Sequence, residues 1–99
     1  MLKIKKEIEN GKVIFKPEGR LDTVTAPQME EEIKSVLPNS SELVFDFKDL
    51  EYISSAGLRV LLSAQKAMNT QGTMKILNVN EIISEIFEVT GFSDILTIE

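Results

Sequence analysis

The sequence predicts an α/β domain with a mixed β-sheet that opens with a β-hairpin and is flanked by helices. Three features indicate this fold class. Two β-prone stretches, 2–9 and 12–18, are joined at Asn10-Gly11, and Asn-Gly is typical of the type I′ turn of a hairpin. Further along, segments of helical periodicity alternate with short apolar runs. Strands separated by helices require right-handed crossovers, so we expect part of the strand pairing to be parallel.

In the opening hairpin, side chains are expected to alternate between the two faces of each strand. Pro17 cannot donate to a strand ladder and is expected near a strand end or an edge. After it, Gly19-Arg20-Leu21-Asp22 is expected to leave the sheet. In the first strand Leu2, Ile4 and Ile8 share one face. In the second, Val13 and Phe15 share a face, and Ile14 adds apolar surface on the opposite side.

A first helix is expected to follow Thr25, because Thr25 and Gln28 have the spacing of a capping box. Pro38-Asn39-Ser40 is expected to end this helix. Its apolar residues recur at helical spacing and predict a buried stripe. That stripe consists of Met29, Ile33, Val36 and Leu37.

The run 43–47 is almost continuously apolar and β-prone, which is typical of a central strand buried on both faces. Asp46 interrupts the run, and a carboxylate in such a strand needs hydrogen-bond partners. Two interpretations of Asp46 are open. It accepts backbone N–H groups of the next loop, or it works beside the serines that follow.

A second helix is expected over 56–71, with Gly72 as its stop. Most of its circumference is apolar, apart from a polar stripe of Arg59, Ser63, Lys66 and Thr70. Such a helix is largely covered by the core or partly offered to another protein.

The C-terminal part predicts one more strand and one more helix. The strand is expected over 74–77, and Asn80 is expected to cap a helix that Thr90-Gly91 ends. Residues 95–98 form either a short final strand or a tail packed on the core. The residues of the third helix expected to face inward are Ile82, Ile83, Ile86 and Phe87.

The composition excludes several classes of function. Cys and His are both absent, which excludes disulfides, zinc sites, Ser-His-Asp triads and Cys nucleophiles. The formal net charge of −5 argues against nucleic acid and anionic membranes, which attract basic proteins. No apolar run approaches the roughly 20 residues of a membrane span, and no signal peptide is recognised at the start. We therefore expect a cytoplasmic location, no membrane insertion and a protein partner.

The sequence does not predict an enzyme or a bound cofactor. It contains no GxxxxGK[ST] phosphate-binding loop, and its five glycines are scattered. Acidic pairs such as Asp22 and Asp46 show no spacing that favours acid–base catalysis over capping roles. A magnesium ion held by Asp22, Asp46 and Asp49 is an alternative to separate capping roles for these carboxylates.

Two adjacent serines, Ser54 and Ser55, lie where a loop turns into the second helix. Two interpretations are open. A serine oxygen can cap the unpaired N–H groups of a first helical turn. The same end of a helix carries the positive pole of its dipole and tolerates a phosphate, so a serine there can also be a phosphorylation switch. Local chemistry does not decide between them.

Several motifs, in register with one another, resemble the STAS domain family. Gly19-Arg20-Leu21-Asp22 is similar to the G-x-L-D opening of that family. The run 43–47, then Asp49-Leu50 and the stretch 52–58 (YISSAGL), resembles its strand and phosphorylation loop. Gly72 before a strand and Thr90-Gly91-Phe92 after a helix also match. The resemblance covers essentially the whole chain, 1–99, whose length is similar to that of stand-alone bacterial anti-sigma factor antagonists.

The resemblance implies a STAS-like fold and a function. Such antagonists bind an anti-sigma factor that is also a serine kinase, and so free a sigma factor for transcription. The kinase phosphorylates the serine after the usual Asp of the loop, which implies Ser55 as the acceptor, and a metal-dependent serine phosphatase restores binding. Ser54 replaces that Asp and is a second candidate acceptor. The residues expected in partner binding are Asp22, Asp46, Ser54, Ser55, Ala56, Gly57 and Arg59.

A phosphate on Ser55 would add a charge of about −1.5 to −2, close to Asp46, Asp49 and Asp22 on this interpretation. The helix dipole would offset part of that charge, so we expect the domain to stay folded in both states. Two other functions are alternatives. One is a non-switching STAS scaffold subunit of a signalling or membrane-transport assembly, and the other is a STAS domain that binds a small ligand or nucleotide.

Overall fold

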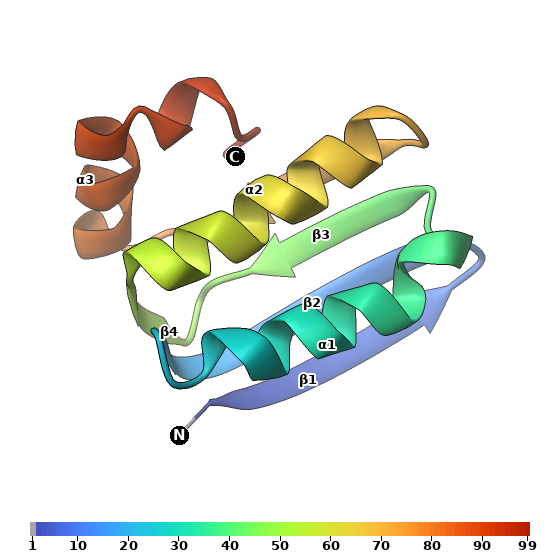
Figure 1. Ribbon diagram of the computed structural model, residues 1–99, viewed down its shortest axis with the longest axis horizontal. Coiled ribbons are helices and arrows are strands. Elements are labelled where there is room, and N and C mark those ends of the chain that lie inside the picture. The colour runs from blue at the N-terminus through green and yellow to red at the C-terminus, as the bar shows by residue number, and fades with distance from the viewer. Residues whose placement is uncertain (1) are drawn as a thin grey trace.

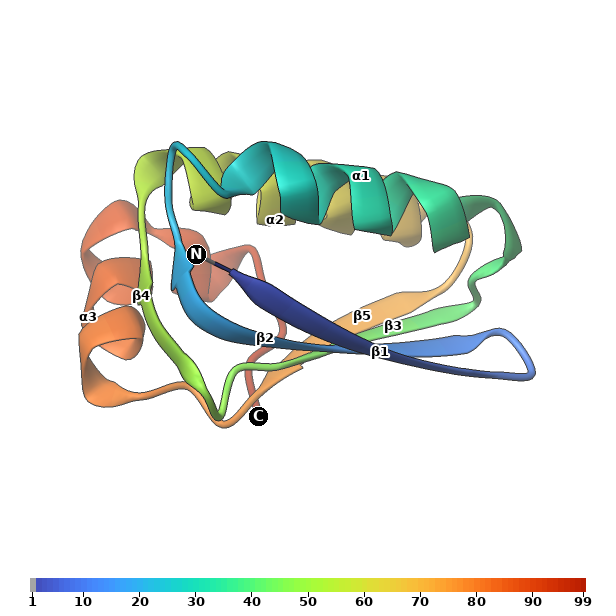
Figure 2. The same cartoon turned by 90° about the horizontal axis from the view of Figure 1, so that it is seen from below.

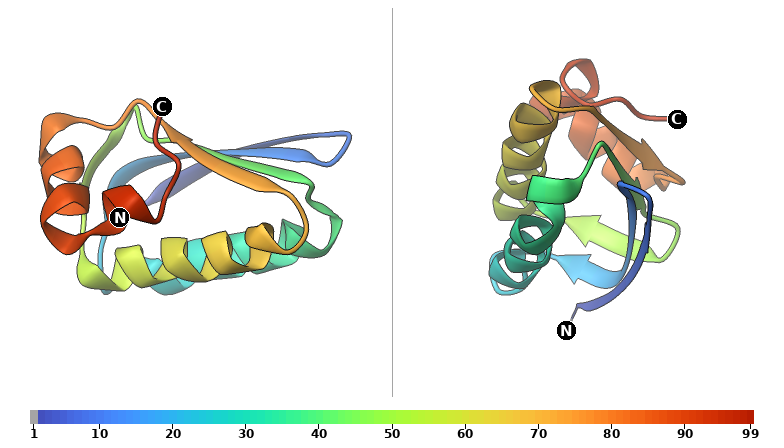
Figure 3. Two further views of the ribbon diagram at one scale, coloured as in Figure 1. Left: turned by 90° about the horizontal axis from the view of Figure 1, so that it is seen from above. Right: turned by 90° about the vertical axis from the view of Figure 1, so that its right-hand side faces the viewer.

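A five-stranded sheet organises the fold, and two long helices cover one of its faces (Figures 1 and 2). The computed structural model describes residues 2–99. Helices α1 and α2 lie side by side on the covered face, and α3 lies at one end of the sheet (Figure 3). The elements in chain order are β1 (Lys3–Glu9), β2 (Lys12–Leu21), α1 (Ala26–Val36), η1 (Leu37–Asn39), β3 (Glu42–Asp46), β4 (Leu50–Ile53), α2 (Ser55–Asn69), β5 (Thr73–Leu77), α3 (Glu81–Thr90) and η2 (Phe92–Asp94).

The strand pairing is the predicted mixture of antiparallel and parallel. β1 and β2 form the hairpin, where Asn10 and Gly11 adopt φ values of 48° and 85°. A type I′ turn requires positive φ at both positions, which explains the Asn-Gly pair. β2 pairs parallel with β3, and β3 pairs parallel with β5, so the sheet order is β1-β2-β3-β5. The prediction of a mixed sheet flanked by helices is confirmed.

The end of β2 differs from the prediction. The segment 19–22 was expected to leave the sheet, but β2 continues to Leu21. It does so because β4 pairs parallel with this extension, matching Arg20 to Tyr52 and Leu21 to Ile53 after a register shift at Gly19. β4 is a strand that the sequence analysis treated as part of a loop. Its short length and its polar Glu51 hide the strand pattern.

The core lies between the covered face of the sheet and the inner faces of the helices. β3 is buried on both faces as predicted, with Leu43, Val44 and Phe45 at most 1% exposed. The predicted stripe of α1 is also buried at Met29 and Ile33. Each such side chain contributes about 1.5–3 kcal/mol when it is removed from water, so these positions hold the two layers together.

Two large apolar residues are exposed, and for one of them, Ile82, the predicted inward orientation is wrong. Ile8 is 60% exposed, because it lies on the edge strand β1 close to the hairpin turn. Ile82 is 58% exposed, whereas its neighbour Ile83 is fully buried. Consecutive residues of a helix point about 100° apart, so α3 can bury only one of the two against β4.

The helix ends show which predicted caps form. Asn80 caps α3, since its Oδ1 accepts a hydrogen bond from the Ile83 N–H at 2.8 Å. Gly91 ends that helix with a φ of 81°, a conformation that glycine adopts without strain. The capping box predicted for α1 is wrong. The Thr25 side chain makes no cap hydrogen bond, and the Gln28 amide instead donates to the Leu2 carbonyl at 3.1 Å.

The C-terminal segment makes one bridge to the sheet rather than a full strand. Ile98 pairs parallel with Ile76 at the edge of β5, and Leu96 is buried against the core. The interpretation as a tail packed on the core therefore describes it best. Within residues 2–99, no helix has both the length and the apolar character needed to cross a membrane.

Candidate functional site

The pairing of β2 with β4 brings two loops together at one end of the molecule (Figure 2). The Ser54 N–H donates to the Leu21 carbonyl at 2.9 Å. As a result, the start of α2 lies beside the loop that follows β2 and leads into α1. The candidate serines and Asp22 therefore share one surface, although more than 30 residues separate them in sequence.

The first serine occupies the N-cap position without acting as a side-chain cap. Ser54 has the extended backbone of an N-cap, with φ −99° and ψ 177°, and its carbonyl accepts the Leu58 N–H at 2.9 Å. Its side chain makes no cap hydrogen bond, and its Oγ is buried without a hydrogen-bond partner in the described part of the chain. The capping interpretation is thus wrong for the Ser54 hydroxyl.

The second serine has the opposite environment. Ser55 is the first residue of α2, and it is exposed. Its position on the first turn places it at the positive end of the helix dipole, where added negative charge is tolerated. One step along the chain therefore changes a buried hydroxyl into an accessible one, because the helix starts between them.

Gly57 sets how closely this end of α2 approaches the sheet. A Cβ at this position would lie 2.7 Å from the Ile53 Cγ1 and 3.0 Å from the Leu21 carbonyl oxygen. The contact with Ile53 is too short to form without a shift of atoms, and the contact with the Leu21 backbone oxygen is unusually tight. The absence of a side chain at Gly57 therefore lets the first turn of α2 sit directly on the ends of β2 and β4.

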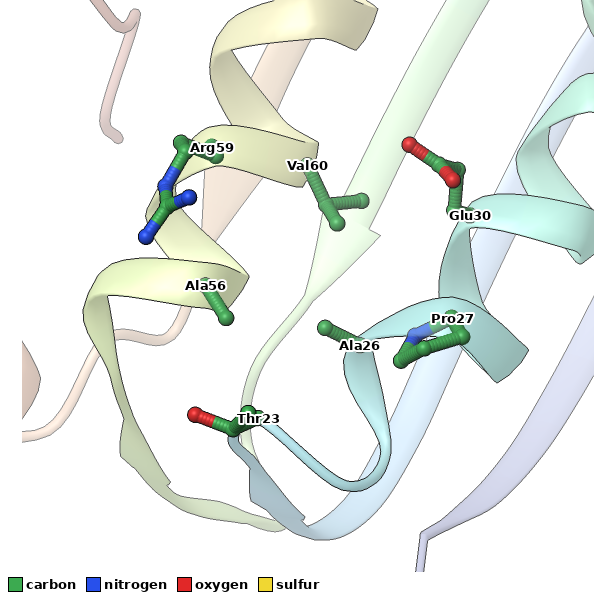
Figure 4. Close-up of a pocket in the computed structure, with 7 residues that line it drawn as sticks. All are labelled: Thr23, Ala26, Pro27, Glu30, Ala56, Arg59 and Val60. Carbon is green, nitrogen blue, oxygen red and sulfur yellow. The ribbon is translucent and has the colours of Figure 1, made fainter.

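A hollow of about 260 Å³ lies between the first turns of α1 and α2 (Figure 4). Ala56 and Arg59 border it on the α2 side, and Glu30 borders it on the α1 side. The site is thus an open depression with a mixed polar and apolar lining, in which Glu30 and Arg59 bring one charge of each sign. The full lining is Thr23, Ala26, Pro27, Glu30, Ala56, Arg59 and Val60.

Asp22 orders the loop that forms the other rim of this surface. Its Oδ1 accepts hydrogen bonds from the backbone N–H groups of Val24 and Thr25 at 3.0 and 3.1 Å. The hydrogen bond from the Thr25 N–H holds the pKa of Asp22 below its ordinary value of 3.8, although partial desolvation acts in the opposite direction. The Val24 N–H, the Thr25 hydroxyl and the charge of Arg20 lower the pKa further. The Asp22 side chain therefore acts first on its own loop.

Thr25 completes the same loop in a way that the sequence did not predict. Its hydroxyl donates to the Arg20 carbonyl at 2.8 Å and accepts the Asp22 N–H at 2.9 Å. With both ends of the loop tied, Val24 projects outward and is 86% exposed. An apolar residue between two threonines, outside any periodic pattern, is the sequence signal that could have singled out Val24.

Asp46 does not lie beside the serines, contrary to one interpretation of the sequence. Successive side chains of a strand point to opposite faces, so Asp46 lies on the face of the sheet opposite to Phe45, which is buried in the core under the helices. Its Oδ1 accepts the Lys48 N–H at 3.1 Å and the Asn78 amide at 2.9 Å. The four residues of β4 then carry the chain about 13 Å toward the helix layer. The interpretation of Asp46 as a partner of loop N–H groups is confirmed.

The acidic cluster expected around the phosphate does not form. The Asp46 side chain lies on the open face, and the Asp49 backbone carbonyl accepts the Gly19 N–H at 3.1 Å at the start of the β4 pairing. Among residues 2–99, no group of three acidic side chains is close enough to hold a metal ion. Of the acidic residues named from the sequence, the structure brings only Asp22 to the serine surface.

The junction of β2 and β4 also carries a pair that the sequence analysis missed. The Arg20 guanidinium lies 4.5 Å from the centre of the Tyr52 ring, and its Nε is 4.0 Å from the Asp22 Oδ2. A cation over an aromatic ring contributes about 0.5–1 kcal/mol at an exposed site. The pair fastens the two strands next to the serines, and the missed strand β4 is the reason that it could not be foreseen.

Comparisons with known proteins identify the family of this chain. The family model described as STAS domain matches residues 3–99. The anti-sigma-B factor antagonist of Bacillus subtilis (strain 168) is 31% identical over 81 residues, which cover 81% of this chain and 74% of that protein. A crystal structure of an anti-sigma factor antagonist from Mycobacterium paratuberculosis has a TM-score of 0.90 at 21% identity, covering 99% of this chain and 85% of that one.

Two structures of the Bacillus protein SpoIIAA add a comparison of states. Its unphosphorylated form has a TM-score of 0.78 and its phosphorylated form 0.77, both at 17% identity and over 98% of this chain. They cover 87% and 91% of the respective SpoIIAA chains. At this identity the likeness concerns the fold alone. With a family match over almost its whole length and a relative above 30% identity, the chain belongs to the STAS domain family.

Proposed function

We propose that this protein is an anti-sigma factor antagonist controlled by phosphorylation of Ser55. With Ser55 bare, it binds an anti-sigma factor that is also a serine kinase, and so frees a sigma factor for transcription in the cytoplasm. Phosphorylation releases the anti-sigma factor, and a metal-dependent serine phosphatase resets the cycle. The similarity to the Bacillus subtilis anti-sigma-B factor antagonist supports the general role.

One observation carries the assignment of the acceptor. Ser55 is exposed at the start of α2, whereas the Ser54 Oγ is buried. A kinase needs the serine oxygen in line with the γ-phosphorus of ATP. The bond from the Ser55 Oγ to that phosphorus forms while the bond from phosphorus to the bridging oxygen of ADP breaks, and the hydroxyl proton passes to a base of the kinase. Of the two serine oxygens, we therefore assign the Ser55 oxygen as the one open to such an approach in the folded domain.

The switch follows from charge at a docking surface. The bare hydroxyl lies beside the hollow and the exposed Val24, a surface that a protein partner can cover. A phosphate dianion there would face the partner without a matching charge. A mismatched charge in a buried contact costs about 2–5 kcal/mol, which corresponds to a loss of affinity of roughly thirty-fold to several thousand-fold.

The domain itself is expected to keep its fold when phosphorylated. The STAS fold of SpoIIAA matches this chain equally well in its two forms, which supports this expectation. No acidic cluster repels a phosphate at Ser55 from within the described residues, since Asp46 lies on the other face of the sheet. The protein then acts by binding, without a catalytic reaction of its own.

The test uses the anti-sigma factor kinase of the same organism, ATP and intact-mass measurement. Wild type and Ser54→Ala are expected to gain one phosphate, and Ser55→Ala none. The bare protein should bind the kinase, and the phosphorylated form should bind at least thirty-fold more weakly. Modification of Ser55→Ala to the same extent as wild type would contradict the acceptor assignment. Binding that is indifferent to Ser55→Glu and to phosphorylation would point instead to a non-switching scaffold.

A further inference from the structure

Arg59 lies on the same face of α2 as Ser55, one helical turn further along. Residues four apart on a helix are neighbours on its surface, and helical side chains lean toward the N-terminal end of the helix. Figure 4 shows the Arg59 side chain turned in this direction, with its guanidinium alongside the first turn of α2. The guanidinium therefore lies within reach of a group added to the Ser55 oxygen.

Arg59 also differs from the other arginine of the chain in what it contacts. Arg20 is already held by the Tyr52 ring and by Asp22. Arg59 is exposed, and none of the ion pairs formed within residues 2–99 includes it. A guanidinium without a carboxylate partner keeps its five N–H donors available for phosphate oxygens, which it binds in bidentate geometry.

We propose that Arg59 holds the phosphate of phosphorylated Ser55 within the same chain and thereby fixes it at the rim of the hollow. This rests on the function proposed above and specifies how its phosphorylated state is built. A phosphate held between Ser55 and Arg59 stands at the edge that Ala56 and Arg59 form. The partner then meets a dianion in one fixed place, and the Arg59 side chain is no longer available to a partner carboxylate.

The charges around Ser55 are consistent with this pairing. The loop after β2 brings Asp22, whose carboxylate is occupied by its own loop and by Arg20. From α1, Glu30 faces the same hollow and lies 3.8 Å from the Lys34 Nζ. Arg59 is thus the cation of the described chain best placed to bind the phosphate. Position 54 is a serine, so the residue before Ser55 brings no negative charge that would compete for Arg59.

The experiment is a phosphorus NMR titration that needs neither kinase nor partner. Phosphoserine is incorporated at position 55 during synthesis of the full chain, in wild type and in the variants Arg59→Gln, Arg59→Lys and Lys66→Gln. A nearby cation favours the dianion, so it lowers the second pKa of the phosphate, which is about 6 without such a partner. Lys66 is an exposed cation on the same face of α2, about two turns further along, and serves as the matched control.

The phosphate of the Arg59→Gln variant is expected to titrate about 0.2 to 0.4 pH unit higher than that of wild type, the size of an exposed ion pair one turn apart. Arg59→Lys should fall between them, and Lys66→Gln should match wild type. Equal titration of wild type and Arg59→Gln would overturn the proposal, as would an equal shift from Lys66→Gln. If Arg59→Gln shifts the titration but an anti-sigma factor binds the phosphorylated and the unphosphorylated protein equally, the contact between Arg59 and the phosphate stands and the proposed switch fails.

Discussion

Replacing Ser54 with alanine tests the most unusual feature of the site. A serine at an N-cap normally accepts a hydrogen bond from the first helical turn, and its replacement by alanine costs about 1 kcal/mol. Ser54 makes no such bond, and its Oγ is buried without a partner among residues 2–99. A buried hydroxyl without a partner costs about 1–3 kcal/mol of desolvation. Ser54→Ala removes that penalty and leaves only a void of one oxygen atom.

We therefore expect Ser54→Ala to be unchanged in its free energy of unfolding, or more stable by up to about 1 kcal/mol. The matched control is Asn80→Ala at the N-cap of α3. Asn80 accepts the Ile83 N–H at 2.8 Å and donates to the Leu50 carbonyl at 3.1 Å. Its replacement should cost about 1–2 kcal/mol, which lowers the melting temperature by roughly 4–16 °C in a domain of this size.

Urea denaturation of the three proteins, followed by circular dichroism, measures both effects on one scale. The slope of free energy against urea should be the same for all three, since none of the changes alters the surface exposed on unfolding. A loss of 1 kcal/mol or more in Ser54→Ala would refute the reasoning, because it would mean that the hydroxyl caps α2 in solution. Equal losses in the two variants would refute it as well.

Three further predictions concern the same surface. Gly57→Ala gains about 1 kcal/mol of helix propensity, but overpacking against Ile53 and Leu21 costs about 1–3 kcal/mol. We therefore expect a net loss of stability, measured by urea denaturation. A gain of about 1 kcal/mol would contradict the close approach of α2 to the sheet. Thr25→Val leaves the Arg20 carbonyl unpaired and should cost about 1–3 kcal/mol, whereas an unchanged urea midpoint would contradict this role. Folding lowers the pKa of Asp22, so the stability that Asp22 contributes is present above its ordinary pKa of 3.8 and is lost as the pH falls through the lower folded value. Urea midpoints measured from pH 6 to pH 2 should therefore fall less steeply in Asp22→Asn than in wild type. Equal dependence of the two midpoints on pH would contradict this role of Asp22.

Much of the fold could be predicted because local signals and tertiary structure agree. The Asn10-Gly11 turn, the buried run of β3 and the Asn80 cap each have a local cause, and each forms as expected. β4 could not be predicted, because it becomes a strand only by pairing with the end of β2. A four-residue segment with one polar residue carries too little pattern to indicate a strand by itself.

The site could be predicted only in part, because some of its features depend on contacts between segments that are distant in sequence. The start of α2, predicted at Ala56 and found at Ser55, and the polar stripe that includes Arg59 follow from helical periodicity. Helical periodicity does not predict which of Ser54 and Ser55 is exposed, because both are small polar residues at a helix start. Their difference comes from the bond between the Ser54 N–H and Leu21 and from the close packing at Gly57, which turn Ser54 toward the interior. These contacts join segments that are distant in sequence.

The position of β4 changes how a phosphate on Ser55 would act. With Asp46 and Asp49 close by, the added charge would strain the domain from within and couple phosphorylation to stability. β4 instead carries the chain away from Asp46, which stays on the open face of the sheet, to the layer of α1 and α2. The charged residues on that side include Asp22, whose carboxylate is occupied by its own loop, and Arg59, which forms no ion pair within residues 2–99. On the proposed function, the domain would tolerate the dianion and the cost of the added charge would fall on binding to the partner, which is what a binding switch requires.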